Sequence, residues 1–151
     1  MGFSKQSLSA LCSLAIFILV IHVPLASSVQ DDSGFLKAHN KARAEAGVPP
    51  LQWNETIAEF AQNSAEKRAE DCTSENSKGP YAENILSSNG DTTGKEAVKL
   101  WTANKCTAAE PPTAEDGCHY AKVVSKRTTQ LGCARVWCKN GNMLLKCDYG
   151  P

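Results

Sequence analysis

The chain has 151 residues, a length typical of a single domain. Its 16 basic and 16 acidic side chains balance, so the composition gives no bulk attraction to nucleic acid or to an anionic membrane.

The amino-terminal segment has the pattern of a secretory signal peptide. Lys5 precedes an almost wholly apolar run over 11–23, and small residues follow from Ala26 to Ser28. This run is shorter than the roughly 20 apolar residues that a membrane span needs. We therefore expect cleavage near Ser28, which assigns 1–28 to the signal and 29–151 to one exported domain. A retained membrane anchor is the alternative.

Export changes the interpretation of the cysteines and histidines. Cys12 and His22 leave with the signal, so any site that needs an imidazole must use His39 or His119. The exported chain keeps an even set of cysteines, and no Cys-x-x-Cys pair is present, which indicates disulfides rather than a zinc site. These cysteines are Cys72, Cys106, Cys118, Cys133, Cys138 and Cys147.

Two helices are predicted at the start of the exported domain. Ser33 is placed to cap a helix over 33–46, and Gly47 is placed to stop it. A second helix begins after Asn54, with Trp53 positioned to pack against its first turn. Asn54 also opens an N-glycosylation sequon, Asn-Glu-Thr, whose occupancy we leave open.

The rest of the chain predicts a short strand, a third helix and a terminal sheet. The strand covers 81–86, and a cap within 91–93 begins the helix. Residues 105–117 form a loop that a cysteine ties at either end. Strand-like segments then cover 120–125, 133–139 and 142–148. Helices followed by an antiparallel sheet predict an α+β fold, with a three-layer α-β-α sandwich as its architecture.

The hairpin near the carboxyl terminus constrains one disulfide. Asn140-Gly141 is a strong turn signal, and a turn centred there makes paired residue numbers sum to about 280. Cys133 and Cys147 satisfy this sum, whereas Cys138 and Cys147 do not. We therefore predict the disulfide Cys133–Cys147, which leaves the other two bridges open among three pairings.

The carboxyl-terminal third is rich in cations. No Asp or Glu lies between His119 and Cys147. A solvated sheet edge is the simpler interpretation of this stretch, and a binding patch is the alternative. The cations are Lys122, Lys126, Arg127, Arg135, Lys139 and Lys146.

Several ordered strings carry a family resemblance. Because of these strings, residues 30–149 resemble the CAP superfamily and, within it, the plant pathogenesis-related protein 1 group. The strings include Ala38-His39-Asn40, Pro50-Leu51-Gln52-Trp53, Tyr81-Ala82-Glu83-Asn84, His119-Tyr120 and Leu131-Gly132-Cys133-Ala134-Arg135-Val136.

The resemblance implies a fold, a location and a set of disulfides. The fold is an α-β-α sandwich, the location is extracellular (the apoplast), and the role is defence against fungi and oomycetes. The implied disulfides are Cys72–Cys138, Cys106–Cys118 and Cys133–Cys147. The last is the bridge that the hairpin register predicts independently.

The family also has a central cleft lined by two His and two Glu. His39, Glu83 and His119 match three of these positions, and Asn104 stands where the family has its second Glu. The three matches are candidate ligands for zinc or another divalent cation, with a water as nucleophile, or Glu83 would act as a general base. Asn104 is neutral, so it can neither serve as an anionic ligand nor accept a proton. It therefore weakens both the metal-site hypothesis and the general-base hypothesis. In the alternative, the two histidines are hydrogen-bonding partners of Glu83 that tie helix to sheet.

Two departures from the family pattern affect the expected ligand. Cys118 directly precedes His119, where the family has a residue between them. Asn104-Lys105 leads straight to Cys106, so the aromatic loop associated with sterol binding in some members is missing.

These features predict a non-enzymatic defence protein. We expect a secreted, monomeric scaffold that binds a sterol or lipid, or a pathogen or host surface protein, with no nucleic-acid partner and no transmembrane segment in the mature form. A zinc-dependent hydrolase and a receptor or interaction module that binds through the basic hairpin are the alternatives.

Overall fold

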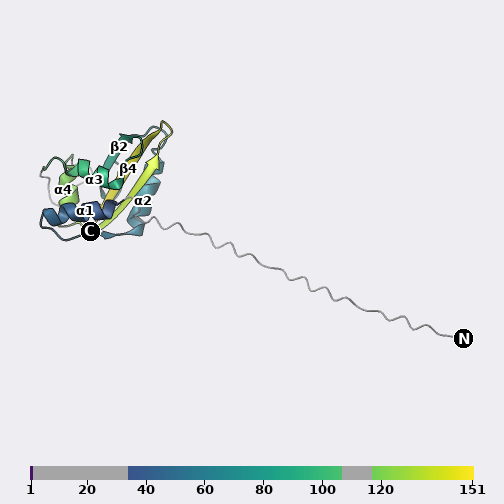
Figure 1. The fold of residues 1–151 in the computed structure, drawn as a ribbon, viewed down its shortest axis with the longest axis horizontal. Coiled ribbons are helices and arrows are strands. Elements are labelled where there is room, and N and C mark those ends of the chain that lie inside the picture. Colours follow the sequence, from purple (N-terminus) through teal and green to yellow (C-terminus); the bar gives the residue numbers. More distant parts are fainter. Residues whose placement is uncertain (2–33, 107–116) are drawn as a thin grey trace.

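The predicted three-layer architecture is confirmed. The computed structural model describes residues 34–106 and 117–151, together with Met1, so the signal segment and most of the 105–117 loop lie outside the described residues. A four-stranded sheet carries helix α2 (Glu55–Glu66) on one face. Helices α1 (Phe35–Glu45), α3 (Gly94–Thr102) and α4 (His119–Val124) lie on the other face (Figure 1).

Local capping explains where α2 and α3 begin. Asn54 caps α2 as predicted, because its side-chain oxygen accepts a hydrogen bond from the Ile57 amide at 3.1 Å. Thr93 and Glu96 form a reciprocal capping box at the start of α3. Helix α1 begins after Gly34, which has a positive φ of 80°, and the expected cap Ser33 lies outside the described residues.

The prediction of a strand over 120–125 is wrong, because these residues form the short helix α4. Cys118 is its cap, and its sulfur accepts from the Ala121 amide at 3.4 Å. At the other end, the buried Arg43 guanidinium donates to the carbonyls of Val123 and Ser125, each at 2.9 Å. These long-range contacts override the strand preference of the valines.

The strands are ordered β1-β3-β4-β2. Strands β3 (Gln130–Trp137) and β4 (Asn142–Gly150) form the predicted hairpin, and Cys133 lies directly opposite Cys147. Strand β2 (Ala82–Asn89) is longer than predicted and pairs antiparallel with β4. The two-residue strand β1 (Gln52–Trp53), which was not predicted, pairs parallel with β3.

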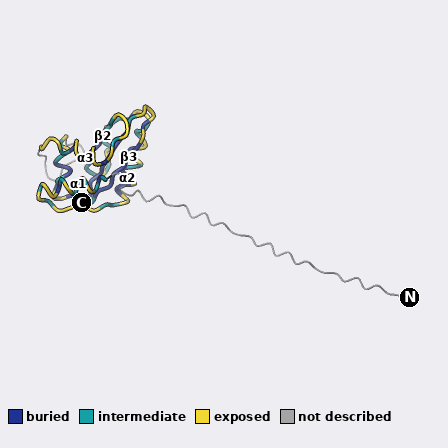
Figure 2. Tube along the Cα trace, viewed as in Figure 1, coloured by how far each residue is buried: buried dark blue, intermediate teal, exposed yellow. Residues whose placement is uncertain are grey.

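Two apolar clusters and three disulfides hold the layers together. Figure 2 shows where along the chain the buried residues lie. The larger cluster lies between α1, α3 and the sheet and contains Phe35, Trp101 and the Cys133–Cys147 bridge. The smaller one lies on the α2 side and contains the Cys72–Cys138 bridge. The third bridge is Cys106–Cys118, so all three pairings have the expected partners. Within the described part of the chain, no helix has the length and apolarity to cross a bilayer.

Candidate functional site

His39 lies on the inner face of α1 and is fully buried. Its Nδ1 is 2.9 Å from the Phe35 carbonyl oxygen, and its Nε2 is 2.9 Å from the Tyr149 hydroxyl. A carbonyl only accepts, so Nδ1 carries the proton and Nε2 accepts from Tyr149. Burial lowers the pKa of His39 to about 4, so the ring is neutral at neutral pH. Both ring nitrogens are therefore engaged.

His119 is joined to the buried histidine through Asn84. The Asn84 amide nitrogen donates to the Tyr149 hydroxyl at 2.9 Å and to the His119 carbonyl at 3.1 Å. Its amide oxygen is 3.0 Å from His119 Nδ1, which donates to it. We call His39, Tyr149, Asn84 and His119 the histidine chain. It connects α1, β4, β2 and α4 through side-chain hydrogen bonds.

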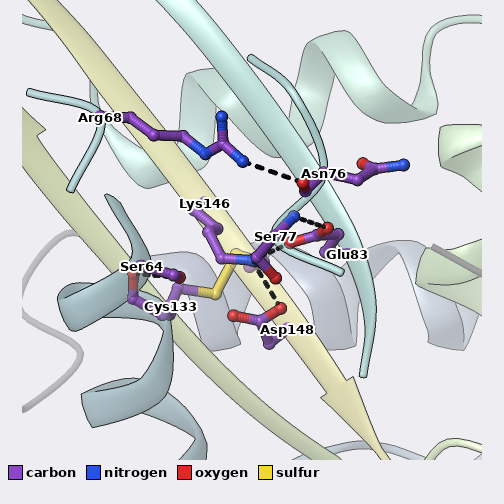
Figure 3. A network of polar contacts seen from close by, with 10 residues as sticks. Ser64, Arg68, Asn76, Ser77, Glu83, Cys133, Lys146 and Asp148 are labelled. Carbon is purple, nitrogen blue, oxygen red and sulfur yellow. Dashed lines mark hydrogen bonds and ion pairs between the residues drawn. A yellow bond between two sulfur atoms is a disulfide. The ribbon is translucent and has the colours of Figure 1, made fainter. Parts of the chain in front are cut away.

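Glu83 lies on the opposite face of the sheet from the histidine chain. Successive side chains of a strand point to opposite faces, so Glu83 points toward α2 while Asn84 points toward α1. Glu83 is buried there, in contact with the Lys146 ammonium, and it accepts a hydrogen bond from the Ser77 amide (Figure 3). The expectation that Glu83 meets His39 and His119 in one cleft is therefore wrong for this structure.

The residues present do not fit a zinc site. Zinc in proteins takes at least three side-chain ligands in a catalytic site. His39 has no free nitrogen, Glu83 faces away, and Asn104 is exposed beyond the end of α3. Among residues 34–106 and 117–151, no three His, Cys, Asp or Glu side chains are grouped to hold a metal ion. The alternative that the histidines tie helix to sheet holds, with Asn84 and Tyr149 as partners in place of Glu83.

Sequence reasoning missed a buried charge cluster formed by Lys146, Glu83 and Asp148 (Figure 3). Lys146 Nζ donates to Asp148 Oδ1 at 2.8 Å and lies 5.6 Å from the centre of the Phe60 ring. One ammonium thus faces two carboxylates. Burial raises the pKa of Asp148 to about 7, which the neighbouring Lys146 partly counteracts. Asp148 Oδ2 is buried without a hydrogen-bond partner.

The six cations of the carboxyl-terminal third do not form one basic surface. Lys122 and Lys146 are buried. Arg135 pairs with Asp91, and Lys139 pairs with Glu70. The binding patch that was the alternative interpretation of this stretch is therefore not formed by the hairpin. The remaining two, Lys126 and Arg127, lie in a groove.

That groove lies between the end of α1 and α4 and has a volume of about 540 Å³. Its walls combine small or apolar side chains with one tyrosine and the two cations. The lining residues are Ala46, Val48, Tyr120, Val124, Lys126 and Arg127.

Glycosylation at Asn54 stays a prediction. The side chain is half-buried, and its nitrogen, the atom that would carry a glycan, donates to the Gln130 side chain. The same side chain caps α2, so a glycan would have to be accommodated next to an occupied cap.

Comparisons with known proteins agree with the resemblance. The model of the CAP family, described as the cysteine-rich secretory protein family, matches residues 36–149. Pathogenesis-related protein 1 of Arabidopsis thaliana is 40% identical over 141 residues, which cover 91% of this chain and 86% of that protein. Pathogenesis-related protein 1C of Nicotiana tabacum is 40% identical over 155 residues, covering 99% and 91%. Among solved structures, the hookworm platelet inhibitor superposes with a TM-score of 0.62 at 25% identity, covering 82% of this chain and 71% of that one.

Proposed function

Because the chain belongs to the cysteine-rich secretory protein (CAP) family, as a pathogenesis-related protein of the plant type 1 group, we propose that it is a secreted defence protein that binds its target without catalysis. Its action is directed at fungi or oomycetes in the extracellular space, through capture of a sterol or another lipid. The signal pattern and the three disulfides support the extracellular location, since disulfides persist in oxidising compartments.

The histidine chain carries the non-enzymatic part of this proposal. A general base or a metal ligand needs a free lone pair, and both nitrogens of His39 are occupied. The carboxylate that would complete a catalytic set is held by Lys146 on the other face of the sheet. His39 and His119 are thus hydrogen-bonded partners that fix α1 and α4 to the sheet.

The groove beside α4 supports the lipid as ligand. The apolar side chains of Val48 and Val124 suit a hydrocarbon body, and Tyr120 adds an aromatic wall with a polar tip. Lys126 and Arg127 supply donors for a polar or anionic head group. This site does not depend on the aromatic loop that the chain lacks.

Ligand binding and growth inhibition by the secreted protein test the proposal. We expect the wild-type protein to bind ergosterol in a competition assay and to slow growth of an oomycete that takes up external sterol. Val124→Lys, which places a charge in the groove, should remove both effects. His119→Gln keeps a hydrogen-bonding side chain outside the groove and should leave both effects intact.

Two results would contradict the proposal. Absence of ergosterol binding and of growth inhibition in the correctly folded protein would remove the lipid-capture function. Hydrolysis that requires zinc and stops on chelation would show that the protein is an enzyme. Circular dichroism and thermal melting of each variant establish that it is folded.

A further inference from the structure

The outward surface of α1 and α3 carries two pairs of lysines. Lys37 and Lys41 are one turn apart on α1, and Lys95 and Lys99 are one turn apart on α3. All four are exposed. Like charges at this spacing destabilise a helix slightly, so each pair opposes folding. We call these four residues the lysine face.

Packing places both pairs on the same side of the molecule. The inner face of α1 carries Phe35, whose ring stacks on the Trp101 ring of α3 at 6.4 Å between centroids. Phe35 and Trp101 belong to the core cluster above the sheet. On α1 the lysines lie opposite the buried residues, whereas on α3 Lys95 flanks the buried residues and Lys99 lies farther round the helix. The lysine face therefore lies on the exposed side of the layer that α1 and α3 form, and Figure 1 shows this layer on the other side of the sheet from α2.

The acids of this layer offset part of the charge of the lysine face. Glu96 accepts hydrogen bonds from Thr93 in the capping box and keeps its negative charge beside Lys95, and Asp91 pairs with Arg135. A third acid, Glu45, lies at the end of α1. These three are the acids within the described segments 34–50, 91–106 and 117–129. Residues 107–116, which include three further acids, lie outside the described part of the chain.

The α2 layer has the opposite sign. Its exposed carboxylates outnumber the cations on that side, even though Glu70 pairs with Lys139 and Glu75 pairs with Arg68. Among the described residues, the two faces of the protein therefore differ in charge. A molecule with this separation is oriented by an anionic surface, because one face is attracted and the other repelled. The exposed carboxylates are Glu55, Glu59, Glu66, Glu70, Asp71 and Glu75.

An exposed apolar side chain on the same helix favours a bilayer over other polyanions. Leu100 follows Lys99 and is 57% exposed. Lysine stems and a leucine suit the head-group region of a bilayer, where the stems contact lipid and the ammonium groups meet phosphates. The lysine face has no arginine or aromatic residue, the types that nucleic-acid recognition uses most.

We propose that the lysine face, with Leu100, is a docking surface for an anionic phospholipid bilayer. This goes beyond the binding of a single lipid in the groove, which involves other residues. A lysine close to an anionic leaflet strengthens binding about fivefold, so four lysines are enough for measurable, reversible attachment. Because the charges are exposed, salt should release the protein.

Vesicle co-sedimentation of the secreted protein tests the proposal. The protein should sediment with phosphatidylcholine vesicles that contain phosphatidylserine, and not with pure phosphatidylcholine vesicles. Lys95→Glu combined with Lys99→Glu should weaken binding by about 25-fold or more, since two attractive charges become repulsive. Lys67→Glu combined with Lys78→Glu, on the α2 side, changes the net charge equally and should leave binding nearly unchanged.

Several outcomes would overturn the docking surface. They are no binding to phosphatidylserine vesicles at low salt, equal weakening by the two double variants, or binding that persists in high salt. Ergosterol binding by the Lys95→Glu, Lys99→Glu variant is measured in parallel and should stay at the wild-type level. Failure of the docking surface is thereby distinguishable from failure of the proposed function.

Discussion

Replacing Asp148 with asparagine should make the stability of the protein depend on pH in a different way. The folded-state pKa of Asp148 is about 7, whereas its ordinary value is 3.8. The folded state thus binds more protons than the unfolded state between these values, so stability falls as pH rises through this window and stays low above pH 7. The shift corresponds to no more than about 4 kcal/mol at pH 8. An asparagine at this position stays neutral at every pH, so the variant does not lose this stability as pH rises.

We therefore expect the free-energy difference between Asp148→Asn and the wild type to grow by up to about 4 kcal/mol, in favour of the variant, from pH 4 to pH 8. Urea denaturation followed by tryptophan fluorescence, at half-unit pH intervals, measures this difference. Glu59→Gln removes an exposed carboxylate from α2 and controls for the change in net charge. A difference that is the same at pH 4 and pH 8 would refute the reasoning.

His39 should act in the opposite direction in the same experiment. Its folded-state pKa of about 4 lies below its ordinary value of 6.5, so the unfolded state binds more protons between them. Stability is therefore lost as pH falls from 6.5 to 4, by up to about 3 kcal/mol. The two effects offset each other in the wild type, which should show a shallow profile. In the Asp148→Asn variant the Asp148 effect is absent, so the free energy of unfolding should fall clearly as pH drops below 6.5.

Three further substitutions test the packing and the histidine chain. Asn84→Asp puts an acceptor-only carboxylate beside the Tyr149 hydroxyl, so the pKa of His39 should rise from about 4, as followed by NMR of its ring protons. Tyr149→Phe leaves His39 and Asn84 without their shared partner and should cost about 2 kcal/mol in urea denaturation. Gly132→Ala would bring a methyl group within 2.1 Å of the α2 backbone, so it should cost about 3 kcal/mol or more. As a control, Gly117→Ala should be nearly neutral in the same assay, because no atom of the described residues lies within 4 Å of the added methyl group.

Local signals were sufficient for most of the secondary structure. The Asn54 and Thr93 caps and the Asn140-Gly141 turn each act within a few residues, and the structure uses all of them. The hairpin register followed from the turn alone, because strand alternation fixes every pair once the turn is placed. Helix α4 was missed because six residues are too few for a helical period to show, and its ends are fixed by Cys118 and by Arg43.

The position of Glu83 required information that no local pattern contains. Which face a strand residue occupies depends on which strand it pairs with and in what register. Strand β2 pairs with β4, 50 or more residues away in the chain, so that Asn84 lies opposite Cys147. Cys147 points toward α1 because its disulfide belongs to that core cluster. Asn84 shares that side, and Glu83 is left to face α2.

This one-residue alternation explains why Asn84 and Glu83 have different hydrogen-bonding partners on the two faces of the sheet. An asparagine both donates and accepts, so Asn84 satisfies the Tyr149 hydroxyl and the His119 ring at the same time. An ionised carboxylate at that position only accepts, and the tyrosine hydroxyl would then turn away from His39. On the other face, Glu83 has an ammonium beside it, which keeps its charge compensated in the interior. Asn84 and Glu83 thus each lie on the face of the sheet where their hydrogen-bonding groups find partners. If the two residues exchanged faces, His39 would lose the hydrogen bond from Tyr149, and Lys146 would lose one of its two carboxylate partners.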